Sequence, residues 1–230
     1  MKHLRAASAA AALCLLGAGG GQLDSAYVLQ RYAQALQSLE QPKVVVYSYT
    51  VSQVGRSNIE QRHRVYRRNL EVRDETLAID GITLLRKIVR FSQHADRYAV
   101  TRFAPSASAY EMLFSGTTRD GRHLDYVYET TPLSHSGAAT IDRLTIDGTT
   151  FLPRAVHFRS GGGDIEGSAV VEFGPSGKYW MPMLASATAR VGGKPAHEEI
   201  VWSDYRFPAS LPPQTFAAPK PLPPSALPPI

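Results

Sequence analysis

The chain has 230 residues, a formal net charge of +5 and a single cysteine, Cys14. About 210 residues remain after a predicted targeting segment, which is enough for one sizeable domain with its own core. Because Cys14 lies inside the targeting segment, the composition excludes disulfides and thiol chemistry in the mature chain.

The first 21 residues have the pattern of a cleaved export signal. Lys2 and Arg5 form its positive start, and the apolar run over 6–16 is shorter than the roughly 20 residues of a membrane span. Leu13 precedes Cys14, where a lipoprotein signal has a small residue, so we expect no lipid anchor. An exported chain without disulfides fits a bacterial periplasm or cell surface.

One amphipathic helix is predicted over 25–39, with Asp24 or Ser25 as its cap and Pro42 as its stop. Apolar side chains recur along one of its faces at helical spacing: Val28, Leu29, Tyr32, Ala35, Leu36 and Leu39. This face is apolar enough to pack on a sheet.

From Lys43 the hydrophobic period changes from 3.6 to 2, which is typical of strands. The segment 43–54 is rich in Val, Tyr and Thr, and 59–72 alternates as one long strand. Its length favours a large curved sheet over a compact sandwich. The alternation places His63, Val65 and Arg67 on one face and Arg62, Arg64, Tyr66 and Arg68 on the other.

Basic residues are concentrated in this part of the chain. Residues 56–102 carry eleven Lys or Arg and six Asp or Glu. We expect a basic surface patch formed by Arg62, Arg64, Arg67 and Arg68, which could meet anionic phospholipid headgroups or an acidic partner face. A solvated outer face of two strands is the alternative. Nucleic acid is excluded as a partner for an exported protein.

The regular alternation breaks between Asp80 and Gln93, where apolar residues are interspersed with Arg86, Lys87 and Arg90. We favour a short helix or irregular lid here, with an apolar strand as the alternative. Its apolar side, which includes Leu84, Ile88 and Phe91, would cover the mouth of the sheet.

Further strands are predicted to the end of the domain, joined by turns rich in Gly, Asp and Pro. They span 97–104, 110–117, 123–131, 141–146, 151–159, 165–173, 179–191 and 198–207. A sheet of this extent must curl or close. The fold predicted is mainly β with few helices, as a large curved antiparallel sheet that forms a half-open barrel with a helical lid.

The layout resembles the LolA-like superfamily of periplasmic lipoprotein and lipid carriers, which includes outer-membrane lipoprotein-sorting proteins and the sensor RseB. The resemblance is carried by five segments: 27–32 (YVLQRY), 44–47 (VVVY), 65–68 (VYRR), 148–153 with Phe158, and 202–207 (WSDYRF) with Leu211 and Pro212. It implies a half-open barrel around an apolar cavity that holds acyl chains, within a single domain over 22–216. A proline-rich flexible tail over 217–230 would follow.

Aromatic residues on the predicted strands, with the lid, are the candidate ligand contacts, since Tyr and Trp offer an apolar body with a polar tip. The candidates are Tyr47, Tyr49, Tyr66, Leu84, Ile88, Phe91, Phe114, Tyr126, Tyr128, Phe158 and Trp202. Ordinary packing in the core is the alternative for each of them.

No motif of nucleophilic, metal or phosphate chemistry is present in the sequence. The mature histidines are scattered, no Gly-x-Ser-x-Gly motif surrounds any of them, and His197 with Glu199 supplies only two potential ligands. We therefore expect a noncatalytic, monomeric carrier or sensor of a lipid or lipoprotein acyl chain, with no cofactor or metal. An RseB-like module that contacts a membrane or envelope protein is one alternative. A hydrolase is another, and it predicts a His–carboxylate pair in a cleft.

Overall fold

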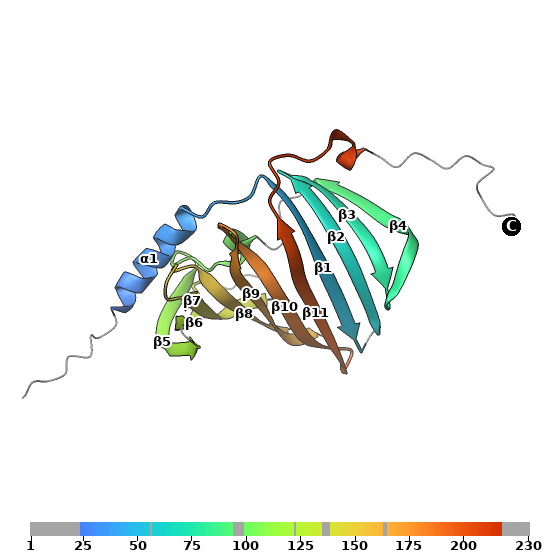
Figure 1. The fold of residues 1–230 in the computed structure, drawn as a ribbon. Coiled ribbons are helices and arrows are strands. Elements are labelled where there is room, and N and C mark those ends of the chain that lie inside the picture. Colours follow the sequence, from blue (N-terminus) through green and yellow to red (C-terminus); the bar gives the residue numbers. More distant parts are fainter. Residues whose placement is uncertain are drawn as a thin grey trace, which may run out of the picture.

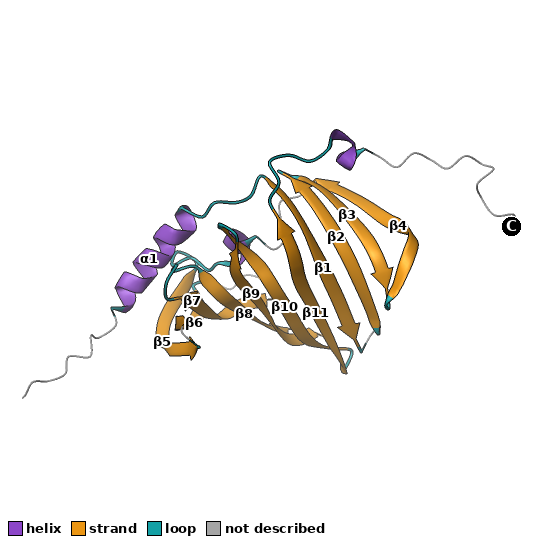
Figure 2. Ribbon diagram, viewed as in Figure 1, coloured by secondary structure: helices purple, strands orange, loops and turns teal. Residues whose placement is uncertain are grey.

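A single curved antiparallel sheet of eleven strands forms the body of the protein (Figure 1). The computed structural model describes residues 24–55, 57–93, 99–121, 123–134, 139–162 and 165–217. The strand order is β4-β3-β2-β1-β11-β10-β9-β8-β7-β6-β5, so β4 and β5 are the two edges and the sheet stays open. Short helices accompany it (Figure 2). The predicted fold class, mainly β with a large curved antiparallel sheet, is confirmed.

The elements follow one another mostly through hairpins. In chain order they are α1 (Ser25–Gln37), β1 (Val44–Val54), β2 (Ile59–Arg68), β3 (Glu71–Ile79), β4 (Ile82–Gln93), α2 (Val100–Phe103), β5 (Tyr110–Asp120), β6 (His123–Pro132), β7 (Ala139–Asp147), β8 (Pro153–Gly162), β9 (Ile165–Ser176), β10 (Tyr179–Val191), β11 (Lys194–Arg206) and the 3₁₀ turn η1 (Pro213–Phe216).

The first and last strands of the chain, β1 and β11, pair with each other inside the sheet. Tyr49 lies opposite Trp202 and Val51 lies opposite Ile200 in this ladder. The pairing joins the β1–β4 meander to the β5–β11 meander, so side chains from both meanders share one continuous face.

Two tight turns change the elements expected from the sequence. Asn69, at φ 53°, begins the turn between β2 and β3, so the single long strand predicted over 59–72 is wrong. Asp80 and Gly81, at φ 49° and 78°, turn the chain into β4. Asn, Asp and Gly are the residues that adopt positive φ most readily, and paired positive φ values suit a two-residue hairpin.

The lid predicted over 80–93 is therefore wrong as a helix or irregular segment, because β4 is a strand hydrogen-bonded to β3. Its β-branched and aromatic residues favour this state, which agrees with the stated alternative. The strand predicted over 97–104 is also wrong in its described part, where Val100–Phe103 form α2. The helix predicted over 25–39 is confirmed as α1, and Asp24 is its cap, accepting from the amides of Ala26 and Tyr27.

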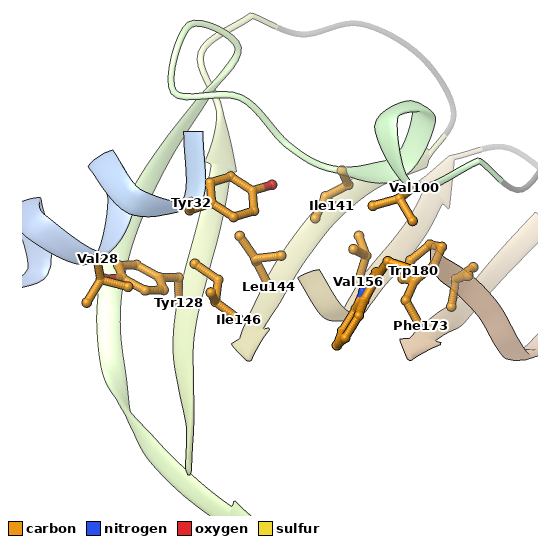
Figure 3. Close-up of a cluster of buried hydrophobic side chains, with 11 residues drawn as sticks. Val28, Tyr32, Val100, Tyr128, Ile141, Leu144, Ile146, Val156, Phe173 and Trp180 are labelled. Carbon is orange, nitrogen blue, oxygen red and sulfur yellow. The ribbon is translucent and has the colours of Figure 1, made fainter. Parts of the chain in front are cut away.

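The main core lies between the two helices and strands β6–β10 (Figure 3). Val28 and Tyr32 of α1 and Val100 of α2 point toward the sheet, and all three are buried. The Tyr32 hydroxyl donates to the carbonyl of Pro105 at 2.8 Å. Beneath them lie buried side chains of the sheet: Tyr128, Ile141, Leu144, Ile146, Val156, Val171, Phe173 and Trp180.

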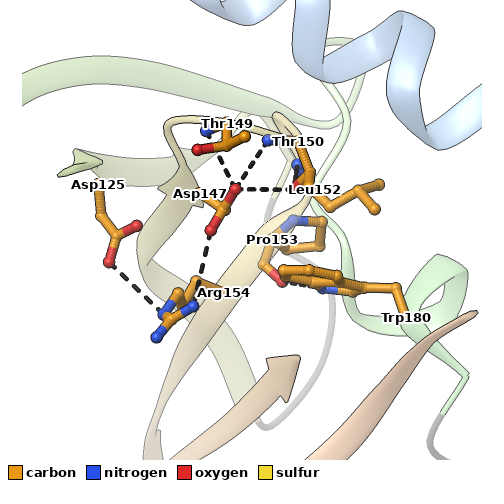
Figure 4. Close-up of polar contacts among 8 residues, drawn as sticks. All are labelled: Asp125, Asp147, Thr149, Thr150, Leu152, Pro153, Arg154 and Trp180. Atoms are coloured by element: carbon orange, nitrogen blue, oxygen red, sulfur yellow. Dashed lines mark hydrogen bonds and ion pairs between the residues drawn. The ribbon is translucent and has the colours of Figure 1, made fainter. Parts of the chain in front are cut away.

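The turn between β7 and β8 is held by Asp147 (Figure 4). Its carboxylate accepts from the Thr149 amide at 3.0 Å, from the Thr150 amide at 2.7 Å and from the Thr150 hydroxyl at 2.9 Å. The Arg154 guanidinium lies 3.6 Å from a carboxylate oxygen of Asp147 and 3.6 Å from a carboxylate oxygen of Asp125. Asp147 is therefore a structural residue of the turn, as its place in the sequence indicates.

The same turn positions α1. Phe151 adopts φ 58° and presents its ring to the helix. The ring lies edge-on to Tyr27 at 6.2 Å, and the Arg31 guanidinium lies over it at 5.3 Å. Positive φ costs a bulky residue free energy, so these contacts with α1 help to stabilise the conformation.

Candidate functional site

One face of the sheet carries both the core and the candidate site. Direct cross-strand partners share a face, and the row Tyr128–Leu144–Val156–Val171–Ala185–Ile200–Val51–Gln61 runs from β6 to β2. We call this face the inner face, and the opposite one the outer face. The helices cover its β6–β10 part. The β11 and β1–β4 part has no such cover among the described helices.

A cavity of about 630 Å³ lies on this uncovered part of the inner face. We call it the inner-face cavity. Its aromatic and aliphatic lining residues are Tyr47, Tyr49, Val51, Val65, Val72, Phe91, Ile200 and Trp202. Its polar lining residues are Gln53, Gln61, His63, Arg67, Asp74, Arg90, Ser92 and Glu198. The mixed lining differs from the wholly apolar cavity that the family resemblance implies.

A second hollow, of about 730 Å³, lies at the hairpin ends of β8–β11. Small residues such as Gly161, Gly167, Ala189 and Ala196 form much of it, and its lining includes no Phe, Tyr or Trp side chain. Because binding pockets combine apolar surface with a few convergent polar groups, the inner-face cavity is the stronger candidate.

A hydrogen-bonded cluster lies on the wall of the inner-face cavity. The Tyr49 hydroxyl donates to one oxygen of Asp74 at 2.7 Å, and His63 Nδ1 lies 2.9 Å from the other. The rings of Tyr49 and His63 are stacked, with centroids 4.5 Å apart and an interplanar angle of 6°. Both carboxylate oxygens of Asp74 are therefore engaged, and the cluster joins β1, β2 and β3.

This cluster gives each hydrogen bond a defined direction. Burial and the hydrogen bond to Asp74 raise the pKa of Tyr49, so its hydroxyl stays protonated and donates. In the tautomer of His63 that donates to the Asp74 carboxylate, Nδ1 carries the proton. His63 Nε2 then faces the side-chain amide of Gln61 at 3.2 Å, which can turn to present either its oxygen or its nitrogen.

The His63–Asp74 pair is the His–carboxylate pair in a cleft that the hydrolase alternative predicts. A triad, however, needs a hydroxyl or thiol at the other ring nitrogen. That nitrogen, Nε2 of His63, is hydrogen-bonded to the Gln61 side chain. The Thr76 hydroxyl lies 3.5 Å from Nδ1, the ring nitrogen that faces Asp74. The arrangement can orient and hydrogen-bond a ligand, but it lacks an activated nucleophile among the described side chains.

Replacing Asp74 by alanine tests how strongly the cluster is coupled. The change removes the acceptor of two largely buried donors, so we expect the free energy of unfolding to fall by about 1 to 3 kcal/mol in urea titrations. Asp142→Ala is the matched control, because among the described residues Asp142 pairs with the exposed Arg159, at 3.1 Å. That variant should lose less than about 1 kcal/mol. Equal losses in the two variants would contradict a coupled cluster.

The predicted contact residues fall into three groups. Tyr47, Tyr49 and Trp202 line the inner-face cavity. Phe91 also borders it, but Phe91 lies opposite Arg73 in the ladder and its ring is 5.8 Å from the Arg73 guanidinium on the outer face. Phe114, Tyr126, Tyr128 and Phe158 lie in the helix-covered core or pack against it. Tyr66, Leu84 and Ile88 are outside the residues that line the cavity, and Tyr66 alternates with Val65 onto the outer face.

The predicted basic surface patch is divided between the two faces. Arg62, Arg64 and Arg68 lie on the outer face, whereas Arg67 lines the inner-face cavity and is only 6% exposed. The placement of Arg67 in a surface patch is thus corrected, for the reason that strand alternation already gives.

On the outer face, the positive charge is partly neutralised. Arg68 pairs with Glu71 at 2.8 Å and lies over the ring of Phe216 in η1 at 4.8 Å. Arg73 pairs with Glu75 at 2.8 Å and donates to the carbonyl of Thr215 at 2.7 Å. These contacts hold the end of the described chain against β3.

Sequence reasoning missed the polar residues of the inner-face cavity, above all Asp74, Arg90 and Gln61. The alternation of β2 already placed His63 and Arg67 on one face. What the sequence could not supply was the register of β2 with β3 and β4, which sets Val65 beside Asp74 and Asp74 beside Arg90.

Comparisons with known proteins give matches among solved structures only. No protein-family model matches the chain. No curated protein matches it either. A domain described as an outer-membrane lipoprotein-sorting protein from Vibrio parahaemolyticus is similar, with 13% identity and a TM-score of 0.47, covering 82% of this chain and 95% of that one.

Two further structures match over similar lengths. A DUF1329 family protein from Desulfovibrio piger has 10% identity and a TM-score of 0.45, covering 83% of this chain and 96% of that one. A LolA superfamily protein from Nitrosomonas europaea has 13% identity and a TM-score of 0.36, covering 84% and 97%.

Membrane-spanning helices and metal-binding clusters are both absent from the residues that the structure describes. None of the described helices has the length and apolar character needed to cross a membrane. Within the same residues, no three His, Cys, Asp or Glu side chains come together as a group that could hold a metal ion.

Proposed function

We propose that the chain is a noncatalytic periplasmic carrier or sensor that binds the acyl chain of a lipid or lipoprotein in the inner-face cavity. The binding domain would span 22–216, after removal of a signal over 1–21 and before a flexible tail over 217–230. The inner-face cavity is the observation that carries this function. Its volume of about 630 Å³ lies in the range of about 300 to 1,000 Å³ typical of small-molecule sites.

The apolar part of the lining is suited to an acyl chain. Val51, Val65, Ile200 and Trp202 come from three different strands and lie along one stretch of the cavity. Burying each methylene stabilises a complex by about 0.8 kcal/mol, so a long chain gains affinity without specific polar contacts. His63 Nε2 is hydrogen-bonded to the Gln61 side chain rather than to a hydroxyl or thiol nucleophile, which supports a noncatalytic role.

Native mass spectrometry with organic extraction tests this function directly. The protein would be purified without detergent from a periplasmic preparation, and we expect a copurifying amphiphile of defined mass. A clean apo mass, repeated after incubation with membrane vesicles, would contradict the carrier function.

A second candidate function is contact with an envelope protein through the β4 edge. This edge strand exposes Ile82, Leu85 and Ile88, and Leu85 is fully exposed. Exposed, unpaired edge strands are templates for pairing with another chain. A photocrosslinker at Leu85, activated in cells, should give an adduct with one envelope protein if this function holds, and no discrete adduct if it does not.

A further inference from the structure

The inner-face cavity has a basic end. In the β2–β3–β4 ladders, Arg67 lies opposite Val72 and Val72 opposite Ser92, while Asp74 lies opposite Arg90. The positions of Arg67 and Arg90 are therefore two strands apart, about 10 Å across the sheet. Both residues line the inner-face cavity, and arginine side chains are long enough to converge on one group across that gap.

Arg90 has unused hydrogen-bonding capacity. The carboxylate of its cross-strand partner, Asp74, is already engaged by Tyr49 and His63. Within the part of the chain that the structure describes, Arg90 makes no hydrogen bond or ion pair. A guanidinium offers five donors in a planar fork that matches carboxylate and phosphate oxygens. Its position at the rim of a binding cavity makes a bound anion the natural partner.

The opposite end of the inner-face cavity has the opposite character. Glu198 accepts from the Gln53 side chain there, and the pair lies beyond Val51 and Ile200. Asp74 lies beside Arg90 but is engaged by Tyr49 and His63; apart from it, the order along the strands is basic, then apolar and aromatic, then acidic. An amphiphile with one negative charge would bind in a single orientation, with its anion away from Glu198.

We infer that the inner-face cavity takes an acidic amphiphile, whose phosphate or carboxylate lies against Arg67 and Arg90. Its acyl chain would extend past Val65 and Trp202 toward Ile200. This inference rests on the proposed function and refines it, because it adds the charge of the ligand's headgroup to its acyl chain.

The test compares three probes by isothermal titration calorimetry on the delipidated protein: palmitoyl lysophosphatidic acid, monopalmitoylglycerol and inorganic phosphate. The two lipids share one acyl chain and differ in the charged group. We expect the lysophosphatidic acid to bind at least about tenfold more tightly than the monoacylglycerol, and phosphate alone to bind far more weakly than either. Palmitate in place of the lysophosphatidic acid distinguishes a carboxylate from a phosphate preference.

Arg90→Gln should reduce that preference at least about threefold, with Arg67 retaining part of it. Arg90 is exposed on an edge strand, so the variant should fold. Arg86→Gln removes the same charge from the same strand outside the cavity lining, and should keep the preference. Arg67→Gln is less informative, since replacing a buried cation can destabilise the domain.

The possible outcomes distinguish a failure of this inference from a failure of the proposed function on which it rests. Binding of neither lipid would contradict the proposed function itself. Equal binding of the two lipids, or an unchanged preference in Arg90→Gln, would overturn the inference and leave acyl-chain binding standing. Phosphate binding as tight as that of the lysophosphatidic acid would overturn it as well, by pointing to a site for the free anion.

Discussion

Replacing Leu144 by alanine should lower the free energy of unfolding by about 3 kcal/mol. Leu144 lies on β7 between Tyr128 and Val156, is fully buried and faces α1 (Figure 3). Removing a buried leucine side chain costs its transfer free energy and leaves a cavity, which together amount to about 2 to 5 kcal/mol. Urea titration followed by fluorescence measures the loss, because Trp180 lies in the same core.

The control is Leu113→Ala on β5. Leu113 is 67% exposed on an edge strand, so its removal should change the free energy of unfolding by less than about 0.5 kcal/mol. A loss at Leu144 no larger than that at Leu113 would contradict a core built between α1 and the inner face. In that case, the packing of α1 would not explain why the β6–β10 part of the inner face is covered while the β11 and β1–β4 part is open.

That core explains how the fold was predictable from the sequence. The apolar stripe of α1 and the period-2 segments each have one face to bury, and a helix on a curved sheet buries both. Turn residues are as informative: the turn predicted between the strands over 141–146 and 151–159 is the β7–β8 hairpin, which Asp147 holds. Asn69 has the same turn chemistry and separates β2 from β3, where alternation alone predicts one strand.

The β4 strand shows where local pattern was insufficient. Its sequence mixes cations with apolar residues without strict alternation. This agrees with the ladder between β3 and β4, which is irregular between Thr76 and Ala78. The bulge leaves Leu85 fully exposed. A period analysis assumes regular pairing, so a bulged edge strand is easily taken for a helix.

The candidate site was only partly predictable, for a related reason. Tyr47, Tyr49 and Trp202 were expected to face a ligand, and they line the inner-face cavity. The cluster at Asp74 depends on cross-strand register. Hydrophobic patterning predicts the face of the sheet on which a side chain lies, but not its partner on the neighbouring strand. Four predicted contact residues lie instead in or against the helix-covered core: Phe114, Tyr126, Tyr128 and Phe158. Their placement was not predictable, because the sequence of their own strands does not indicate where α1 packs.

Filling the inner-face cavity should abolish most acyl-chain binding. Val51 lies on β1, half-buried, between Ile200 and Gln61 on the inner face. A tryptophan at this position would occupy space along the path of the chain. Displacing about four methylenes at about 0.8 kcal/mol each corresponds to a loss of about 200-fold in affinity. Titration of monopalmitoylglycerol into Val51→Trp measures it independently of headgroup charge.

Val201→Trp makes the same addition on the other side of the sheet. Val201 follows Ile200 on β11, faces outward and is 41% exposed, so its replacement should leave lipid affinity within about twofold. Circular dichroism and urea titration of both variants exclude unfolding as the cause of any loss. Undiminished binding in a folded Val51→Trp variant would mean that the chain lies outside the inner-face cavity. A loss in Val51→Trp alone would place the chain along β1 and β11, where the two meanders of the sheet join.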